Sequence, residues 1–206
     1  MRYTCVDTSE FLYPDITNYQ SGTDSIHILT PRGSFASAQI LFSDLSSKTL
    51  NIRFEGFEPE VYEMIPIFVE ENHLLDETNS HPHIPERVAP YYVYDCLKPV
   101  KNNLSVDENE VSAIYFSEKI PQNAEVGVRY GKIIVDNIEI SVEIEVSSVI
   151  VPDESLTMIQ GYRQNSVCKY HNVECGTNEF EELDTKYLKA LRRMRQNMLY
   201  CPGPNV

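Results

Sequence analysis

Hydrophobic and polar residues alternate along most of the chain, from about residue 24 to residue 152. The clearest run is residues 138–146, where Ile or Val occupies every second position and Glu or Ser stands between them. A period of two residues predicts a strand with one buried and one solvated face, which is typical of antiparallel sheets. Similar runs recur upstream, at residues 25–30, 34–45, 49–57 and 60–69. About seven to nine short strands with turn residues between them predict a mainly β fold, an antiparallel β-sandwich of immunoglobulin or jelly-roll type.

Two connections in this region have distinct signals. Residues 131–141 hold two apolar runs joined by Asp136 and Asn137, which both tolerate positive φ, so a tight two-residue hairpin is expected. Residues 71–103 are rich in proline and polar residues, which predicts a long loop. The run at residues 91–97 is the one candidate strand within it.

The pattern changes after Pro152. A short apolar strand at residues 155–162 is followed by a polar stretch at residues 163–177 and then by one helix. Asn178 is the candidate N-cap of that helix, with Glu181 three residues further on. Apolar side chains recur at helical spacing and form one stripe: Phe180, Leu183, Tyr187, Leu191, Met194 and Met198.

A second apolar strand at residues 197–203 completes a β-α-β tail, which implies two parallel strands. The sequence therefore predicts a β-sandwich domain at residues 1–152 and a β-α-β segment at residues 153–206. Two strands and one helix cannot bury their own apolar faces. The tail either packs on the sandwich or begins a larger α/β domain, and in the second case its exposed helix stripe would favour self-association.

Three segments carry a resemblance to a known family. Residues 30–42 contain Arg-Gly followed by a strand that starts with Gln, and residues 113–135 contain Pro-x-x-Ala-x-x-Gly-x-x-Tyr-Gly. Residues 143–152 end a strand with an apolar residue and Pro. The chain resembles the N-terminal β-sandwich of a group of bacterial proteins of unknown function that are regarded as glycoside hydrolases. The family pattern has an acid after Arg-Gly, and Ser34 departs from it, so that position's role does not carry over.

In that group a (β/α)8 barrel follows the sandwich directly. The resemblance therefore implies that residues 153–206 are the first strand, helix and second strand of a truncated barrel. It also implies that the catalytic carboxylates lie on later strands, because barrel active sites form at the C-terminal ends of the strands. No catalytic residue is expected within the 206 residues, and the chain alone is expected to be inactive.

The net charge of the chain limits the classes of binding partner that we expect. The formal net charge is −14, from 31 acidic and 17 basic residues, which disfavours nucleic acid and anionic membranes. No stretch approaches the roughly 20 apolar residues of a membrane span, and residues 1–15 lack the features of a secretory signal. We expect a cytoplasmic protein, or a secreted one whose signal has been removed.

Metal and cofactor signals are weak. The five cysteines are an odd number at scattered positions, which is not a disulfide framework. Cys168, His171 and Cys175 have the spacing of half a zinc site, and residues 81–83 read His-Pro-His in a loop. The nucleotide-binding glycine motifs and the nucleophile-elbow motif are absent from the sequence. The prediction is no metal and no cofactor.

Aromatic residues are the remaining candidates for contact with a sugar, although aromatic rings more often pack in cores. Six residues are substrate-contact candidates, from residues 91–94 and from the strand ends of the tail: Tyr91, Tyr92, Tyr94, Tyr162, Arg163 and Tyr200. The first hypothesis is a non-catalytic accessory sandwich that braces a carbohydrate-active barrel. The alternatives are a stand-alone carbohydrate- or protein-binding module and a cell-surface adhesion domain.

Overall fold

A computed structural model describes residues 1–45, 49–72, 87–101, 103–105, 111–153 and 157–200. The chain divides into two compact units, Met1–Val151 and Pro152–Val206, and each is described by itself.

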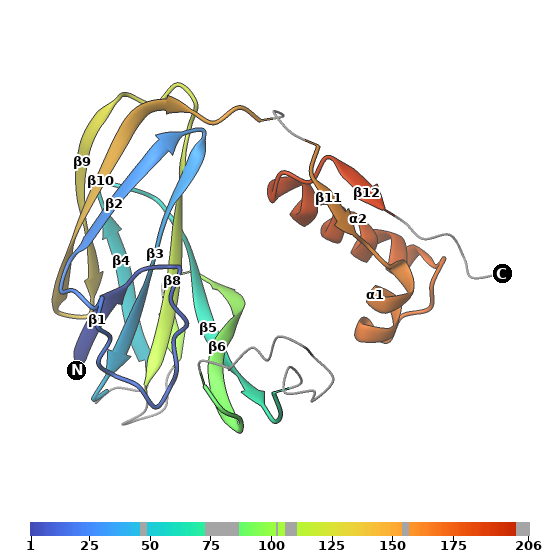
Figure 1. Cartoon of the computed structure of the whole chain (residues 1–206), viewed down its shortest axis with the longest axis horizontal. Coiled ribbons are helices and arrows are strands. Elements are labelled where there is room, and N and C mark those ends of the chain that lie inside the picture. Colours follow the sequence, from blue (N-terminus) through green and yellow to red (C-terminus); the bar gives the residue numbers. More distant parts are fainter. Residues whose placement is uncertain (46–48, 73–86, 102, 106–110, 154–156, 201–206) are drawn as a thin grey trace, which may run out of the picture. The chain divides into compact units, whose positions relative to one another are not determined.

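The first unit is a sandwich of two sheets, which Figure 1 shows as facing layers. The first sheet has the order β1 (Arg2–Val6), β3 (Ser34–Ser43), β8 (Ser112–Ile120), β5 (Glu60–Val69) and β6 (Tyr91–Val100). The second has the order β2 (Ile26–Arg32), β10 (Ile138–Ile150), β9 (Gly127–Val135), β4 (Thr49–Glu55) and β7 (Asn103–Ser105). The predicted mainly β sandwich is confirmed, with five described strands in each sheet. Strand β1 lies before the alternating region, and β7 begins at residue 103, where the predicted long loop ends.

Strand β10 shows the predicted alternation, since Ile140, Val142, Ile144 and Val146 are all buried. It runs antiparallel to β9 but parallel to β2. The sheet is therefore mixed rather than purely antiparallel. A period of two residues reports which face is buried and carries no information about the direction of the neighbouring strand.

The predicted hairpin between β9 and β10 is confirmed. Val135 lies opposite Ile138, so Asp136 and Asn137 form the two-residue connection, and Asp136 has a φ of 52°. The carboxylate of Asp136 also accepts a hydrogen bond of 2.9 Å from the backbone N–H of Asn51. This bond ties the turn to the neighbouring strand β4.

The main core lies between the two sheets. Its largest fully buried side chains include Phe42, Phe116, Ile40 and Ile133. Burying a side chain of this size contributes about 1.5–3 kcal/mol relative to leaving it exposed. Burial of the inward-facing side chains of both sheets thus contributes most of the hydrophobic stabilisation of the sandwich.

A second, smaller core covers the outer face of the first sheet. Leu41 of β3 belongs to it, whereas its neighbours Ile40 and Phe42 belong to the main core. Leu12, from the segment after β1, is fully buried in this second core. The buried amide of Gln39 donates hydrogen bonds of 2.7 Å to the carbonyls of Asp7 and Glu10. These contacts hold the segment after β1 on the sheet.

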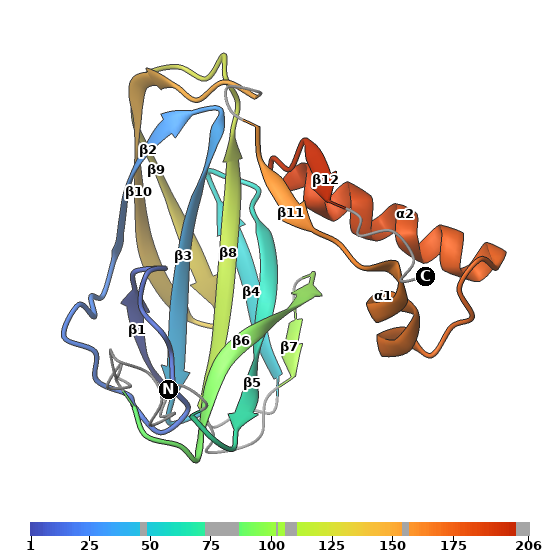
Figure 2. The ribbon, with the colours of Figure 1, turned by 45° about the vertical axis from the view of Figure 1, so that its right-hand side comes forward.

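The second unit contains parallel strands β11 (Ile159–Gly161) and β12 (Met198–Tyr200), with helix α2 (Asn178–Arg193) between them in sequence. Figure 2 shows α2 running beside both strands. The predicted strand-helix-strand tail is confirmed. A further helix, α1 (Gln164–His171), occupies part of the segment that was predicted as a polar stretch. Its buried residues are only Val167 and Cys168, so it carries no long apolar stripe to reveal it.

Helix α2 begins one residue earlier than predicted. Thr177 is the N-cap, and its hydroxyl accepts a 3.3 Å hydrogen bond from the N–H of Phe180. Asn178 is therefore the first helical residue rather than the cap. The predicted stripe also extended too far, because Met194 is the C-cap and Met198 belongs to β12.

Cys168 and Cys175 form a disulfide, with their Cα atoms 5.7 Å apart. The interpretation of the five cysteines as forming no disulfide framework is therefore wrong for this pair. The two sulfurs are bonded to each other, and His171 lies 2.8 Å from the hydroxyl of Tyr187. Within the described ranges no three side chains of His, Cys, Asp or Glu gather as metal ligands. Residues 81–83 and Cys201 lie outside the described residues.

Over the part of the chain that the structure describes, no helix is long and apolar enough to cross a bilayer.

Candidate functional site

An exposed pair of aromatic rings lies at the end of the β5–β6 hairpin. Phe68 of β5 is paired directly with Tyr92 of β6, and the ring centroids are 5.0 Å apart. The two residues are 51% and 52% exposed, although rings of this size are normally buried. Two neighbouring solvent-exposed aromatic rings can stack on an apolar face of a ligand, which makes this pair a candidate platform.

Tyr91 has a different environment from its neighbour Tyr92. Its ring meets that of Tyr13 edge-on at 5.8 Å, and the guanidinium of Arg87 lies 5.3 Å from its centroid. Arg87 also lies 4.5 Å above the Tyr13 ring and forms an ion pair with Asp15. The hydrogen bond from Arg87 lowers the pKa of Asp15. This cluster joins the segment after β1 to the start of β6, so Tyr91 serves packing there.

Tyr94 is buried in the second core, at 5% exposure. Its hydroxyl donates a 2.8 Å hydrogen bond to the carbonyl of Val111, and its N–H donates one of 2.9 Å to the carbonyl of Leu12. Of the three tyrosines of this strand that were predicted as substrate-contact candidates, Tyr92 is therefore the one with a solvent-exposed ring. Phe68 was missed, although the alternation of β5 places it on the same side as Met64, away from the main core.

Tyr162 in the second unit is buried at 7% exposure. Its hydroxyl donates a hydrogen bond to Asp184 of α2, and the amide of Gln164 lies 3.5 Å from the other carboxylate oxygen. Arg163 is exposed and precedes α1 as its N-cap residue. Tyr200 lies opposite Gly161 in the two-stranded sheet, and its side chain falls outside the described part.

These contacts place Tyr162 in a structural network between β11 and α2. The network was not predicted, because Tyr162 and Asp184 are 22 positions apart and no local motif connects them.

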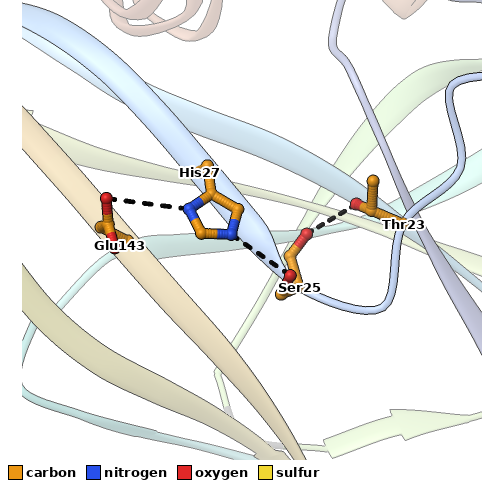
Figure 3. A network of polar contacts seen from close by, with 4 residues as sticks. All are labelled: Thr23, Ser25, His27 and Glu143. Atoms are coloured by element: carbon orange, nitrogen blue, oxygen red, sulfur yellow. Dashed lines mark hydrogen bonds and ion pairs between the residues drawn. The ribbon is translucent and has the colours of Figure 1, made fainter.

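A third polar cluster joins β2 and β10 and is drawn in Figure 3. His27 lies between Ser25, 3.3 Å from its hydroxyl, and Glu143, 3.8 Å from its carboxylate. Thr23 donates a 2.6 Å hydrogen bond to the carbonyl of Ser25. The order Ser-His-acid resembles that of a hydrolase triad.

The environment does not suit acyl transfer. The side chain of His27 is 65% exposed, and its 3.8 Å separation from Glu143 is too long for a hydrogen bond. A triad also needs a site shielded from water with donors for the oxyanion. His27 and Glu143 are direct cross-strand neighbours, so we interpret the cluster as a surface contact that supports the pairing of β2 with β10.

Comparison with known proteins gives a result at the level of fold. No family model matches the sequence, and no curated protein resembles it in sequence. A solved structure does match: a family 123 glycoside hydrolase from Clostridium perfringens, reported in a structural analysis of glycolipid glycan hydrolysis. The TM-score is 0.72 at 12% identity, and the match covers 96% of this chain and 37% of that one.

Two further solved structures were also compared. They are CaCohA2 from Clostridium acetobutylicum, with a TM-score of 0.28, and the seventh ScaB type I cohesin from Pseudobacteroides cellulosolvens, with a TM-score of 0.20. Each is 15% identical, and the matches cover 59% and 65% of this chain and 86% and 95% of the other chains. Scores this low do not indicate a shared fold.

The chain therefore shares its fold with part of that glycoside hydrolase, and this fold is a β-sandwich followed by a strand-helix-strand unit. It spans little more than a third of the length of the glycoside hydrolase that it matches.

Proposed function

We propose that this chain is a non-catalytic accessory region of a carbohydrate-active enzyme, formed by a β-sandwich and the first strands and helices of a (β/α)8 barrel. The observation that carries the proposal is the match to the family 123 glycoside hydrolase, which extends over both units of the chain.

The second unit supports the barrel part of the proposal. Strands β11 and β12 are parallel, and parallel strands occur almost entirely in sheets whose two faces are covered. Only two such strands are described, with α1 and α2 as the available cover. Further strand-helix units would complete a sheet of this kind, and the substrate would then bind at the carboxyl ends of its strands.

The sandwich itself is assigned a bracing role. Its most regularly spaced acids, Glu139 and Glu145 of β10, are exposed on the outer face, and Glu139 forms an ion pair with Lys132. Hydrolysis of a glycoside needs two carboxyl groups on either side of the bond. We expect no turnover of aryl glycosides by this chain. Reproducible hydrolysis that a carboxylate substitution within the chain abolishes would contradict the proposal.

The reading frame that encodes the chain gives the most direct test of the architecture. We expect the codons after Val206 to continue with further alternating strand and helix patterns. A stop codon immediately after Val206 would contradict the barrel assignment and favour a binding module.

A stand-alone carbohydrate-binding module is the second candidate, favoured by the exposed Phe68–Tyr92 pair. Stacking of a sugar on these rings would give saturable binding to a glycan panel, lost in Phe68→Ala and Tyr92→Ala. Tyr130→Ala is the matched control, because Tyr130 is 73% exposed on the other sheet. Equal binding by all three variants would exclude the platform.

A further inference from the structure

A groove with a volume of about 490 Å³ lies where strand β8 ends and strand β9 begins. Its lining includes Glu118 and Arg129, with Pro121, Val126 and Val128 as apolar neighbours. Val126 and Val128 are 56% and 45% exposed. Lys119 and Glu125 also line the groove, so it combines two acids and two bases with an apolar surface. None of these residues belongs to the aromatic platform.

Glu118 and Arg129 lie at positions on the inner faces of the two sheets. Glu118 alternates with Phe116 and Ile120 along β8, and both of these belong to the main core. Arg129 lies opposite Ile144, another residue of that core. Both residues therefore occupy inner-face positions at one end of the sandwich, which usually hold apolar side chains, and Arg129 is exposed to solvent there.

Polar contacts offset only part of the energetic cost of burying the Glu118 carboxylate. Its Oε2 atom is shielded from solvent and has no hydrogen-bond partner among the described residues. Burial raises the pKa of Glu118, while Arg129 and the backbone N–H of Glu58 partly offset that shift. An unpaired buried carboxylate oxygen destabilises a fold, and such groups are enriched where a ligand binds.

Arg129 does not neutralise Glu118 directly. Within the described ranges neither residue takes part in an ion pair, so no guanidinium nitrogen lies within 4.0 Å of the carboxylate. An acceptor and a donor thus face one groove without pairing. An anionic ligand would meet Glu118 and a cationic ligand would meet Arg129, whereas a hydroxyl group can donate to one and accept from the other.

We propose that this groove binds a neutral sugar through a vicinal diol, with Glu118 accepting from the hydroxyls and Arg129 donating to them. Pro121 and Ala124, which also line the groove, contact the C–H face of the ring. The volume lies within the range of small-molecule sites. The choice of a sugar rests on the proposed function, and the groove adds a ligand site outside the barrel.

To test the proposal, the 206-residue chain is titrated with a panel of neutral methyl glycosides. Binding is measured by calorimetry and by saturation-transfer NMR. We expect saturable binding of at least one glycoside, weakened on the order of tenfold by Glu118→Gln, because a charge-assisted hydrogen bond becomes a neutral one. Arg129→Gln should weaken binding similarly and serves as the second variant if Glu118→Gln fails to fold. Glu145→Gln, an exposed carboxylate on β10, is the matched control and should bind normally.

Three results would overturn the proposal: no saturable binding of any glycoside, equal binding by Glu118→Gln and Arg129→Gln and the parent chain, or loss of binding in Phe68→Ala and Tyr92→Ala alone. The last result would place the sugar on the aromatic platform. None of these outcomes bears on the reading frame after Val206, so a failure of the groove is distinguishable from a failure of the accessory-domain assignment.

Discussion

Gly131 in strand β9 shows how a single missing side chain shapes the sandwich. The ring of Phe57 and the carbonyl of Glu55 occupy the space that a Cβ atom at residue 131 would need. Phe57 is buried in the main core, so its ring has little room to move away. The glycine of the Tyr-Gly motif is thus explained by close packing.

We predict that Gly131→Ala destabilises the sandwich by about 1–3 kcal/mol through overpacking. The measurement is urea unfolding monitored by circular dichroism. Gly161→Ala is the control, because a Cβ atom added to this strand glycine would meet no atom within 4 Å, so the change should be tolerated. Equal stability of Gly131→Ala and the parent chain would show that the Phe57 ring can relax.

Glu118 also gives a prediction at the residue scale. Burial raises its pKa above the ordinary glutamate value of 4.5, helped by the charge of Glu58 and opposed by Arg129 and the Glu58 N–H. A carboxyl group whose pKa is higher in the folded state binds more protons there than in the unfolded state. Its contribution to stability is therefore present at low pH and is lost as the pH rises from about 4.5 through the raised pKa.

Glu118→Gln removes this titration. We expect the free energy of unfolding of the variant to exceed that of the parent by a margin that grows as the pH increases through this window. Urea unfolding at several pH values between about 4 and 7 measures the difference. Parallel stability curves for the two proteins would mean that Glu118 is as well solvated in the folded state as in the unfolded chain.

At the scale of elements, the disulfide links the last turn of α1 to the segment before α2. The bonded residues are seven positions apart, and Cys168 belongs to a small core with Tyr162, Val167 and Phe180. So few buried side chains supply limited hydrophobic stabilisation. The bond restricts the unfolded chain, which favours the folded arrangement of the two helices.

We predict that Cys175→Ser, or reduction by a dithiol, destabilises the second unit by roughly 2–3 kcal/mol and leaves the sandwich unchanged. Hydrogen exchange of the amides of α1 and α2 is the measurement. Cys96→Ser is the control, because Cys96 is a free, exposed cysteine in β6. Equal protection of the helices before and after reduction would contradict the prediction.

At the scale of the whole molecule, each unit has a core of its own. The main core draws only on residues of Met1–Val151, and the small core that contains Tyr162 and Phe180 draws only on residues of the second unit. We predict that residues 1–151 fold alone, with a thermal midpoint within about 4 °C of the sandwich transition in the full chain, which corresponds to less than about 1 kcal/mol. Differential scanning calorimetry compares the two. Failure of residues 1–151 to fold would show that the sandwich needs the second unit.

Much of the architecture was predictable from local pattern. The alternation of residues 138–146, the Asp136–Asn137 hairpin and the apolar stripe from Phe180 to Leu191 each depend on neighbours close in sequence. The N-cap was misplaced by one residue because Thr177 and Asn178 are both good capping residues, and only the hydrogen bond to Phe180 distinguishes them.

The sequence by itself determined that this protein is a β-sandwich followed by a strand-helix-strand tail, because side-chain periodicity encodes which face of an element is buried. Tertiary structure alone decided the parallel pairing of β2 with β10, the burial of Tyr94 and the pairing of Cys168 with Cys175. It also brought Glu118 and Arg129 to one groove. The reason is that these features depend on which distant segments become neighbours, and periodicity along the chain does not carry that information.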